Sequence, residues 1–174
     1  AAPDYCRWLN ISAYRSQMAT APLQTKLGCQ FQCVYCTYRK IEGSTYRLSD
    51  PASVANAVAR LASSGQRDIE FVDSVFNAPY DHAMAVCEAL ARSKQGARLQ
   101  SLELNPRYFD DALVAAMERA GAVRLNAAEV EALTKVAIAT VGEGNDKHDV
   151  PARDFLGQDA AVLARGLGKK IPAE

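Results

Sequence analysis

Segments with a strand-like period of two alternate with segments of helical period between residues 22 and 121. Asp50 followed by Pro51 is typical of a helix start, and Gly65 of a helix end. Such alternation implies parallel strands joined by right-handed helical crossovers, so the sequence predicts an α/β fold. The expected strands are 22–25, 68–73 and 98–104, and the expected helices are 51–64, 80–92 and 110–120.

Three regions are expected along the 174 residues. Residues 1–21 form an N-terminal linker segment, 22–125 form the α/β region with 122–125 as a fourth strand, and 126–174 form a helical or loop-rich tail. Within that tail, Asn126 and Glu129 predict a helix cap and 142–149 predict a mobile polar loop. A further helix is expected at about 154–165.

The charge balance argues against broad electrostatic partners. Twenty basic residues match twenty acidic ones, so we expect no nucleic-acid partner and no membrane partner. The chain lacks an apolar run of about 20 residues, and its start does not resemble a signal peptide. We therefore expect a cytoplasmic protein, and a start at Ala1 rather than Met indicates a piece of a longer or processed chain.

The cysteines are the residues most indicative of chemistry. Three of the five, Cys29, Cys33 and Cys36, lie within eight residues, which is too close for a disulfide framework. A metal or cluster site explains this crowding better. Cys6 and Cys87 stand apart, and Cys87 lies on an apolar helical pattern typical of a buried residue.

The spacing favours an iron–sulfur cluster. A [4Fe–4S] cube ordinarily takes four thiolates, so three cysteines leave one iron open to chelate the amino and carboxylate groups of a methionine moiety. A zinc site is the alternative, but zinc sites usually combine two short Cys or Cys/His pairs. No second pair is present, because His82 and His148 are single and far apart.

The pattern Cys29-x-x-x-Cys33-x-x-Cys36, after a first strand and before a helix, resembles the signature of the radical SAM superfamily. The segments 24–29, 36–38, 41–43 and 71–77 resemble the radical-SAM domain of cobalamin-binding radical SAM proteins, and the similarity covers roughly residues 5–121. The resemblance implies a partial (β/α) barrel, a [4Fe–4S] cluster, S-adenosylmethionine (SAM) and reductive SAM cleavage. Methyl transfer is common in that branch.

The resemblance also implies partners and limits. An external electron donor of flavodoxin or ferredoxin type and a small-molecule or peptide substrate are expected. Cobalamin would be bound by a domain that this chain lacks, and the family's barrel needs more βα units than the three evident here. A truncated or degenerate domain, holding a cluster for electron transfer or protein interaction without SAM turnover, is the alternative to a radical SAM enzyme.

Individual cofactor contacts follow from the same resemblance. Tyr35 would lie beside the adenine. The loop 73–77 replaces the family's Gly-Gly-Glu-type segment, which contacts the methionine amino group, so Asp73, Ser74 and Asn77 are candidate SAM contacts. Glu103 and Asn105, at the end of the third strand, are further candidates. Away from these, His82 is expected to face solvent, as are the four basic residues around the cysteines, Lys26, Arg39, Lys40 and Arg47.

Overall fold

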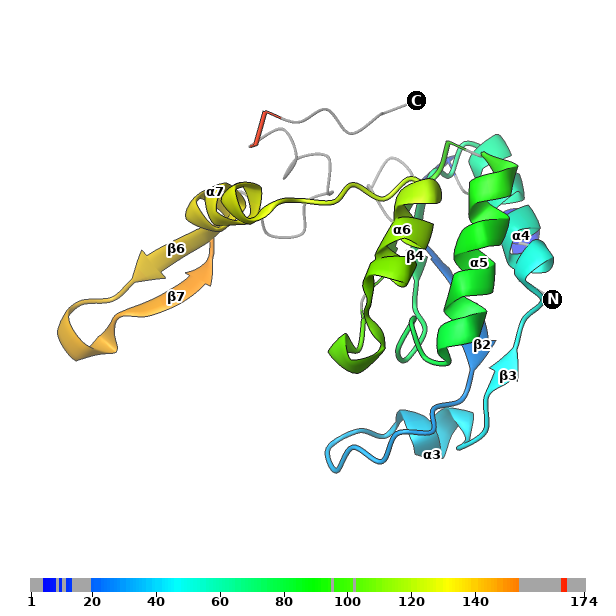
Figure 1. Cartoon of the computed structure of the whole chain (residues 1–174), viewed down its shortest axis with the longest axis horizontal. Helices are drawn as coiled ribbons and strands as arrows, with labels where there is room; N and C mark the ends of the chain where they lie inside the picture. Colours follow the sequence, from blue (N-terminus) through cyan, green and yellow to red (C-terminus); the bar gives the residue numbers. More distant parts are fainter. Residues whose placement is uncertain are drawn as a thin grey trace. The chain divides into compact units, whose positions relative to one another are not determined.

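The computed structural model describes residues 5–8, 10, 12–13, 20–94, 96–101, 103–153 and 167–168. The chain divides into two compact units, Ala1–Ala122 and Val123–Glu174, which we describe separately (Figure 1). The helix expected at 154–165 and the side chain of Cys6 lie outside the described residues. A short helix, α1, at Tyr5–Trp8 lies within the segment expected to be a linker.

A parallel sheet forms the centre of the first unit. It consists of β1 (Ala21–Leu23), β4 (Asp68–Phe71) and β5 (Arg98–Ser101) in the order β1-β4-β5. Both pairings are parallel, with Ala21 opposite Ile69 and Ile69 opposite Leu99. The α/β class with parallel strands is thereby confirmed, while the described strands form an open sheet and not a barrel.

Three helices of this unit begin at, or within one residue of, the positions that the sequence predicts. They are α4 (Pro51–Ser63), α5 (Tyr80–Ser93) and α6 (Asp111–Arg119). Asp50 caps α4 by accepting a 2.8 Å hydrogen bond from Ser53 N, and Asp110 caps α6 through Leu113 N at 2.9 Å.

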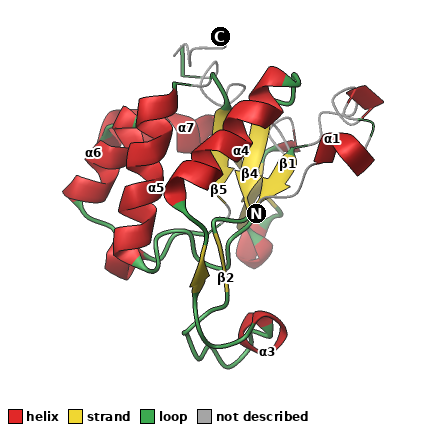
Figure 2. Ribbon diagram, turned by 90° about the vertical axis from the view of Figure 1, so that its right-hand side faces the viewer, coloured by secondary structure: helices red, strands yellow, loops and turns green. Residues whose placement is uncertain are grey.

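These helices pack against the sheet and against their neighbours in chain order (Figure 2). Apolar side chains from the strands and from all three helices form one core between them. Its largest fully buried apolar side chains are Leu23, Val58, Ile69, Val86 and Leu113.

The three clustered cysteines lie in a segment that leaves this sheet between β1 and α4. The short antiparallel strands β2 (Lys26–Leu27) and β3 (Arg47–Leu48) pair with each other, and helix α3 (Tyr38–Glu42) lies between them in the sequence. Figure 1 shows the loop and α3 projecting beyond the ends of α5 and α6. Because β2 follows β1 directly, the loop leaves the carboxyl end of the sheet, as predicted.

The second unit contains α7 (Ala127–Ala137), β6 (Ile138–Val141), a 3₁₀ turn at Gly144–Asp146 (η2) and β7 (His148–Pro151). The predicted cap is confirmed: Asn126 and Glu129 form a capping box. The prediction of a mobile polar loop at 142–149 is wrong. The strands β6 and β7 pair in an antiparallel hairpin, and only the tip of this hairpin is a turn.

The prediction of a fourth strand at 122–125 is also wrong, because these residues form no strand. Ala122, Val123 and Arg124 are exposed and belong to none of the described sheets, and Ala122 N donates to Met117 O at 2.9 Å, a contact at the end of α6. An alternating run this short forms a strand only beside an existing edge. None of the described helices combines the length and the apolar character needed to cross a bilayer.

Candidate functional site

The base of the cysteine loop is closed by backbone and carboxylate contacts. Cys29 N donates to Gly43 O at 3.0 Å, and Gly28 N donates to Glu42 Oε2 at 3.1 Å. Gly28 has a φ of +90°, and a Cβ added there would lie 2.2 Å from Thr45 O. Only glycine therefore allows the two ends of the loop to approach this closely.

The three cysteines of the loop line one open pocket. Cys29 is buried, Cys36 is half-buried and Cys33 is exposed, so the pocket opens from a protein-covered side toward solvent. The pocket has a volume of about 160 Å³, and its other lining residues are Phe31, Gln32, Arg39 and Lys40. The sequence spacing thus brings the three thiols around one space.

The three thiols of the pocket are a donor set that a multinuclear iron–sulfur cluster can use. No set of three or more His, Cys, Asp or Glu side chains in the described residues is arranged to hold one metal ion. A single zinc ion needs its ligands to converge on one point, whereas a [4Fe–4S] cube binds each thiolate at a different iron. Arg39 and Lys40, which also line the pocket, supply positive charge suited to an anionic thiolate cluster.

Asp73, a predicted SAM contact, fixes the strand that leads into the loop. Its Oδ1 accepts hydrogen bonds from Thr25 N at 2.8 Å and Lys26 N at 3.2 Å. Its Oδ2 accepts one from Thr25 Oγ1 at 2.6 Å. These contacts tie the end of β4 to β2, so the buried carboxylate supports the cysteine loop from below.

Lys26 completes this buried group, although the sequence predicts a solvated side chain. The residue is 2% exposed, and its Nζ donates to Val75 O at 2.6 Å and lies 3.5 Å from Asp73 Oδ2. Burial lowers the pKa of Lys26, and the adjacent carboxylate of Asp73 opposes that change. The pairing with Asp73 explains why a charged side chain is buried here.

His82, expected to face solvent, is buried as well. It lies in the first turn of α5, and its Nε2 is 3.0 Å from Thr25 O. Burial lowers the pKa of His82, while the hydrogen bond to Thr25 opposes the change. The first turn of α5 meets the carboxyl end of β1, and this long-range packing covers the imidazole.

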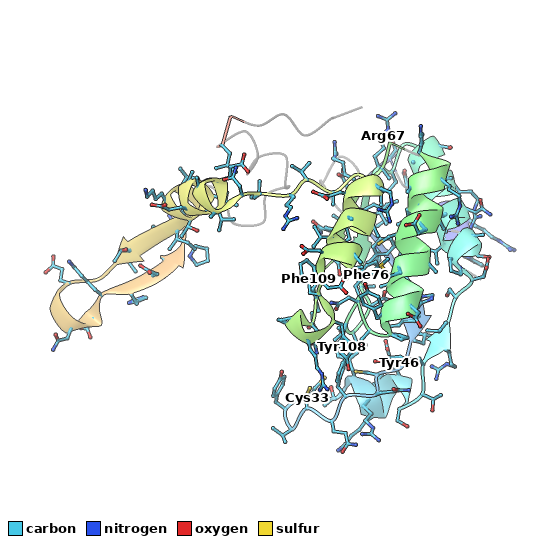
Figure 3. The ribbon with its side chains drawn as sticks, viewed as in Figure 1. Cys33, Tyr46, Arg67, Phe76, Tyr108 and Phe109 are labelled. Atoms are coloured by element: carbon cyan, nitrogen blue, oxygen red, sulfur yellow. The ribbon has the colours of Figure 1, made fainter. Side chains whose placement is uncertain are left out.

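Asn77, another predicted SAM contact, fastens the loop after β4 to the loop after β5. Its Oδ1 accepts from Asn105 N at 2.7 Å, and its Nδ2 donates to Asn105 O and Tyr108 O, each at 2.9 Å. These contacts hold the 3₁₀ turn η1 (Pro106–Tyr108). Figure 3 shows Tyr108 on the side of its unit where Cys33 lies. The centroid of the Tyr108 ring lies 6.1 Å from that of Phe31 in the cysteine loop.

The other predicted contacts do not line the pocket. Tyr35 is 87% exposed on the turn at the tip of the loop, Ser74 is buried, and Glu103 is exposed beyond the end of β5. The backbone of Glu103 is engaged, since its carbonyl accepts from Phe76 N at 2.9 Å. Of the predicted cluster and SAM residues, the described pocket gathers only the three cysteines.

The sequence reasoning missed several residues that shape the site. Glu42 and Thr25 hold the loop base, while Phe31 and Gln32 line the pocket. Glu42 falls in the segment 41–43 that resembles the radical-SAM family, and this was the available signal. Thr25 falls in the segment 24–29, which carries the same resemblance, but its structural role depends on contact with Asp73, 48 residues away.

Comparison with solved structures gives a match where sequence comparison does not. Neither a protein-family model nor a curated protein matches the chain. The fold is similar to that of TsrM from Kitasatospora setae, a radical S-adenosylmethionine methyltransferase, in one structure with cobalamin and a [4Fe–4S] cluster bound. It is equally similar to TsrM with a tryptophan substrate and the SAM analog aza-SAM bound.

In both comparisons the identity is 27% and the TM-score is 0.59. The match covers 64% of this chain and 22% of the TsrM chain, so this chain spans about a fifth of its neighbour. The fold and the cysteine motif point to the same relationship. By its structure, the chain is related to the radical SAM proteins.

Proposed function

We propose that Cys29, Cys33 and Cys36 bind three irons of a [4Fe–4S] cluster and leave the fourth open for SAM. The observation that carries this proposal is the convergence of the three cysteines on one open pocket at the carboxyl end of the parallel sheet. The similarity to TsrM, whose structure holds such a cluster, supports it.

The residues around the pocket have separate tasks in this proposal. The contacts of Gly28 and Glu42 hold Cys29 on the buried side, while Cys33 and Cys36 face the open side. Arg39 and Lys40 balance the negative charge of the thiolates. When bound, the reduced cluster supplies the electron that cleaves the sulfonium C–S bond of SAM.

The finer assignments extend the same proposal. The sheet is one part of a radical-SAM-type barrel, and the reaction is methyl transfer with cobalamin held by another domain. An external flavodoxin- or ferredoxin-type donor supplies electrons, and the substrate is a small molecule or peptide. Tyr35 covers the adenine of SAM from the open tip, while Ser74 and Glu103 contact SAM from the loops after β4 and β5.

Product analysis tests the enzymatic part of the proposal. The chain is reconstituted anaerobically with iron and sulfide, reduced, and incubated with SAM. Formation of 5′-deoxyadenosine or S-adenosylhomocysteine is expected, and Cys33→Ala, treated identically, should form neither. A chain that holds the cluster but forms neither product would contradict SAM cleavage.

A cluster carrier without turnover is the second candidate function. The observation that favours it is the open three-stranded sheet that the described strands form. This function predicts a stable cluster that is reduced and reoxidised reversibly while SAM remains intact. The same incubation therefore separates the two candidates.

A further inference from the structure

A buried ion pair joins Lys26, in the strand that leads into the cysteine loop, to Asp73, and neither residue lines the cysteine pocket. The side chains of Lys26 and Asp73 are 1% and 0% exposed, and Nζ lies 3.5 Å from Oδ2. Burying two charges is costly unless each is well bonded, and replacing such a pair with apolar residues often preserves stability. The presence of the pair therefore calls for an explanation beyond packing.

The two charges are bonded unequally. Asp73 receives three hydrogen bonds from Thr25 and Lys26 in addition to the ion pair. The ammonium of Lys26 has one short hydrogen bond, to Val75 O at 2.6 Å. Both groups are thus held in place, the carboxylate by several donors and the ammonium by one carbonyl and the carboxylate itself.

The field of Lys26 reaches the cysteine pocket. Only Leu27 and Gly28 separate Lys26 from Cys29 in the sequence, and Cys29 is the buried cysteine of the loop. Burial lowers the pKa of Lys26, while the nearby Asp73, Cys29 and Glu42 oppose that change. Charges buried in a protein are screened weakly by salt, so this interaction persists where those of exposed side chains are damped.

We infer that Lys26 and Asp73 tune the reduction potential of the cluster bound at Cys29, with Lys26 favouring the reduced state and Asp73 opposing it. The inference rests on the proposed function, because it requires a cluster in the pocket. Reduction adds one electron to the cluster, and a buried positive charge stabilises the more negative state. Both residues act as positioning and electrostatic residues and do not ligate iron.

The inference is testable because substitutions of Lys26 and Asp73 should shift the reduction potential in opposite directions. We would titrate the reconstituted full chain with dithionite and redox mediators, following the reduced cluster by EPR. Lys26→Met should raise the oxidised-to-reduced ratio about tenfold at the midpoint of the unmodified chain, a shift of about 59 mV to more negative potential. Asp73→Asn should shift the potential to more positive values, because it removes the opposing charge and keeps a side chain of the same shape.

Two variants control for structure and for solvent screening. Lys26→Arg keeps the charge and should restore the potential. Lys40→Met removes an exposed charge from the pocket lining and should give a smaller shift that shrinks further at high salt. Iron content and thermal unfolding of each variant show whether the loop itself is intact.

Each result decides between the possible roles. Shifts of opposite sign for Lys26→Met and Asp73→Asn support the inference. Equal potentials, shifts of the same sign, or loss of the cluster from both variants would overturn it in favour of a structural role. If Lys26→Met alone loses the cluster, the sign of the Asp73→Asn shift decides. An unmodified chain that binds no cluster would instead contradict the proposed function.

Discussion

The base and the tip of the cysteine loop are built in opposite ways. At the base, Gly28 and Cys29 are held by Glu42 and Gly43, and β2 is bonded to the buried carboxylate of Asp73. At the tip, Val34 and Tyr35 project into solvent, with Tyr35 87% exposed. The chain thus fixes where the loop starts and ends while leaving its outer surface open.

This difference indicates that the base and the tip of the loop have different functions. A fixed base positions Cys29 without help from a ligand, and an open tip leaves Cys33 and Cys36 accessible to cluster assembly. Changes at the base should therefore affect both folding and cluster binding. Changes at the tip should affect only what the pocket binds.

The largest expected effect is the loss of the cluster when a ligand is removed. Replacing Cys29, Cys33 or Cys36 with Ala should reduce iron and sulfide per chain to near background, because two thiolates cannot hold the cube stably. Iron and sulfide analysis after anaerobic reconstitution measures this. Full iron content in any of the three variants would contradict the assignment.

Cys87→Ala is the matched control. Cys87 is buried in the core, and burial raises the pKa of its thiol to about 11, so it is protonated at neutral pH and does not ligate metal. This variant should retain its iron. Cys6→Ala should also retain it.

The second largest effect is expected from a substitution at Gly28, at the base of the loop, which should reduce the stability of the chain. Gly28→Ala forces a Cβ to within 2.2 Å of Thr45 O at a φ of +90°. We expect a loss of about 2–4 kcal/mol in the free energy of unfolding, measured by chemical denaturation, together with weaker cluster binding. Gly96→Ala has a φ of +61° with open space around it, and should cost about 1 kcal/mol. Equal costs at the two glycines would contradict the fixed base.

The third largest effect is expected at Asn77, whose side chain joins the loop after β4 to the loop after β5. Asn77→Ala removes three hydrogen bonds and leaves Asn105 N and two carbonyls without their partner, so we expect a loss of about 2–3 kcal/mol in the free energy of unfolding. Asn56→Ala on the exposed face of α4 is the control and should be neutral or slightly stabilising. An unaffected Asn77→Ala variant would show that the loops after β4 and β5 are held in another way.

The smallest expected effect is a pH dependence at His82. Because its pKa is lowered in the folded chain, the unfolded chain binds more protons as the pH falls below about 6.5. The contribution of neutral His82 is therefore complete above that pH and decreases on acidification. Thermal unfolding of the cluster-free chain at pH 7.5 and 5.5 should show a smaller acid loss for His82→Gln than for the unmodified chain. An identical loss in both would contradict this origin.

Local signals were sufficient to predict α4, α5, α6 and α7, but not the short helices α1 and α3. Asp50 and Asp110 cap the helices that their sequence context predicts, and Asn126 forms its capping box with Glu129. Each cap depends on residues three positions apart, and this information is present in any short stretch of sequence. The three cysteines were equally readable, because their spacing alone brings them to one loop.

Features that depend on distant segments were not predictable in this way. Lys26 and His82 have the residue types of exposed positions, and they are buried because Asp73 and Thr25 meet them across the end of the sheet. The hairpin of β6 and β7 escaped prediction for a related reason: His148–Pro151 has no strand-like pattern of its own and is ordered by pairing with Ile138–Val141. Both cases follow from tertiary context overriding local propensity.

EPR of the reduced, reconstituted chain with and without SAM tests the central claim most directly. If Cys29, Cys33 and Cys36 hold a [4Fe–4S] cluster with one open iron, SAM should alter the spectrum of the reduced cluster by binding that iron. A cluster spectrum that SAM leaves unchanged would contradict the open-iron site, and a chain without any iron–sulfur signal would contradict the cluster itself.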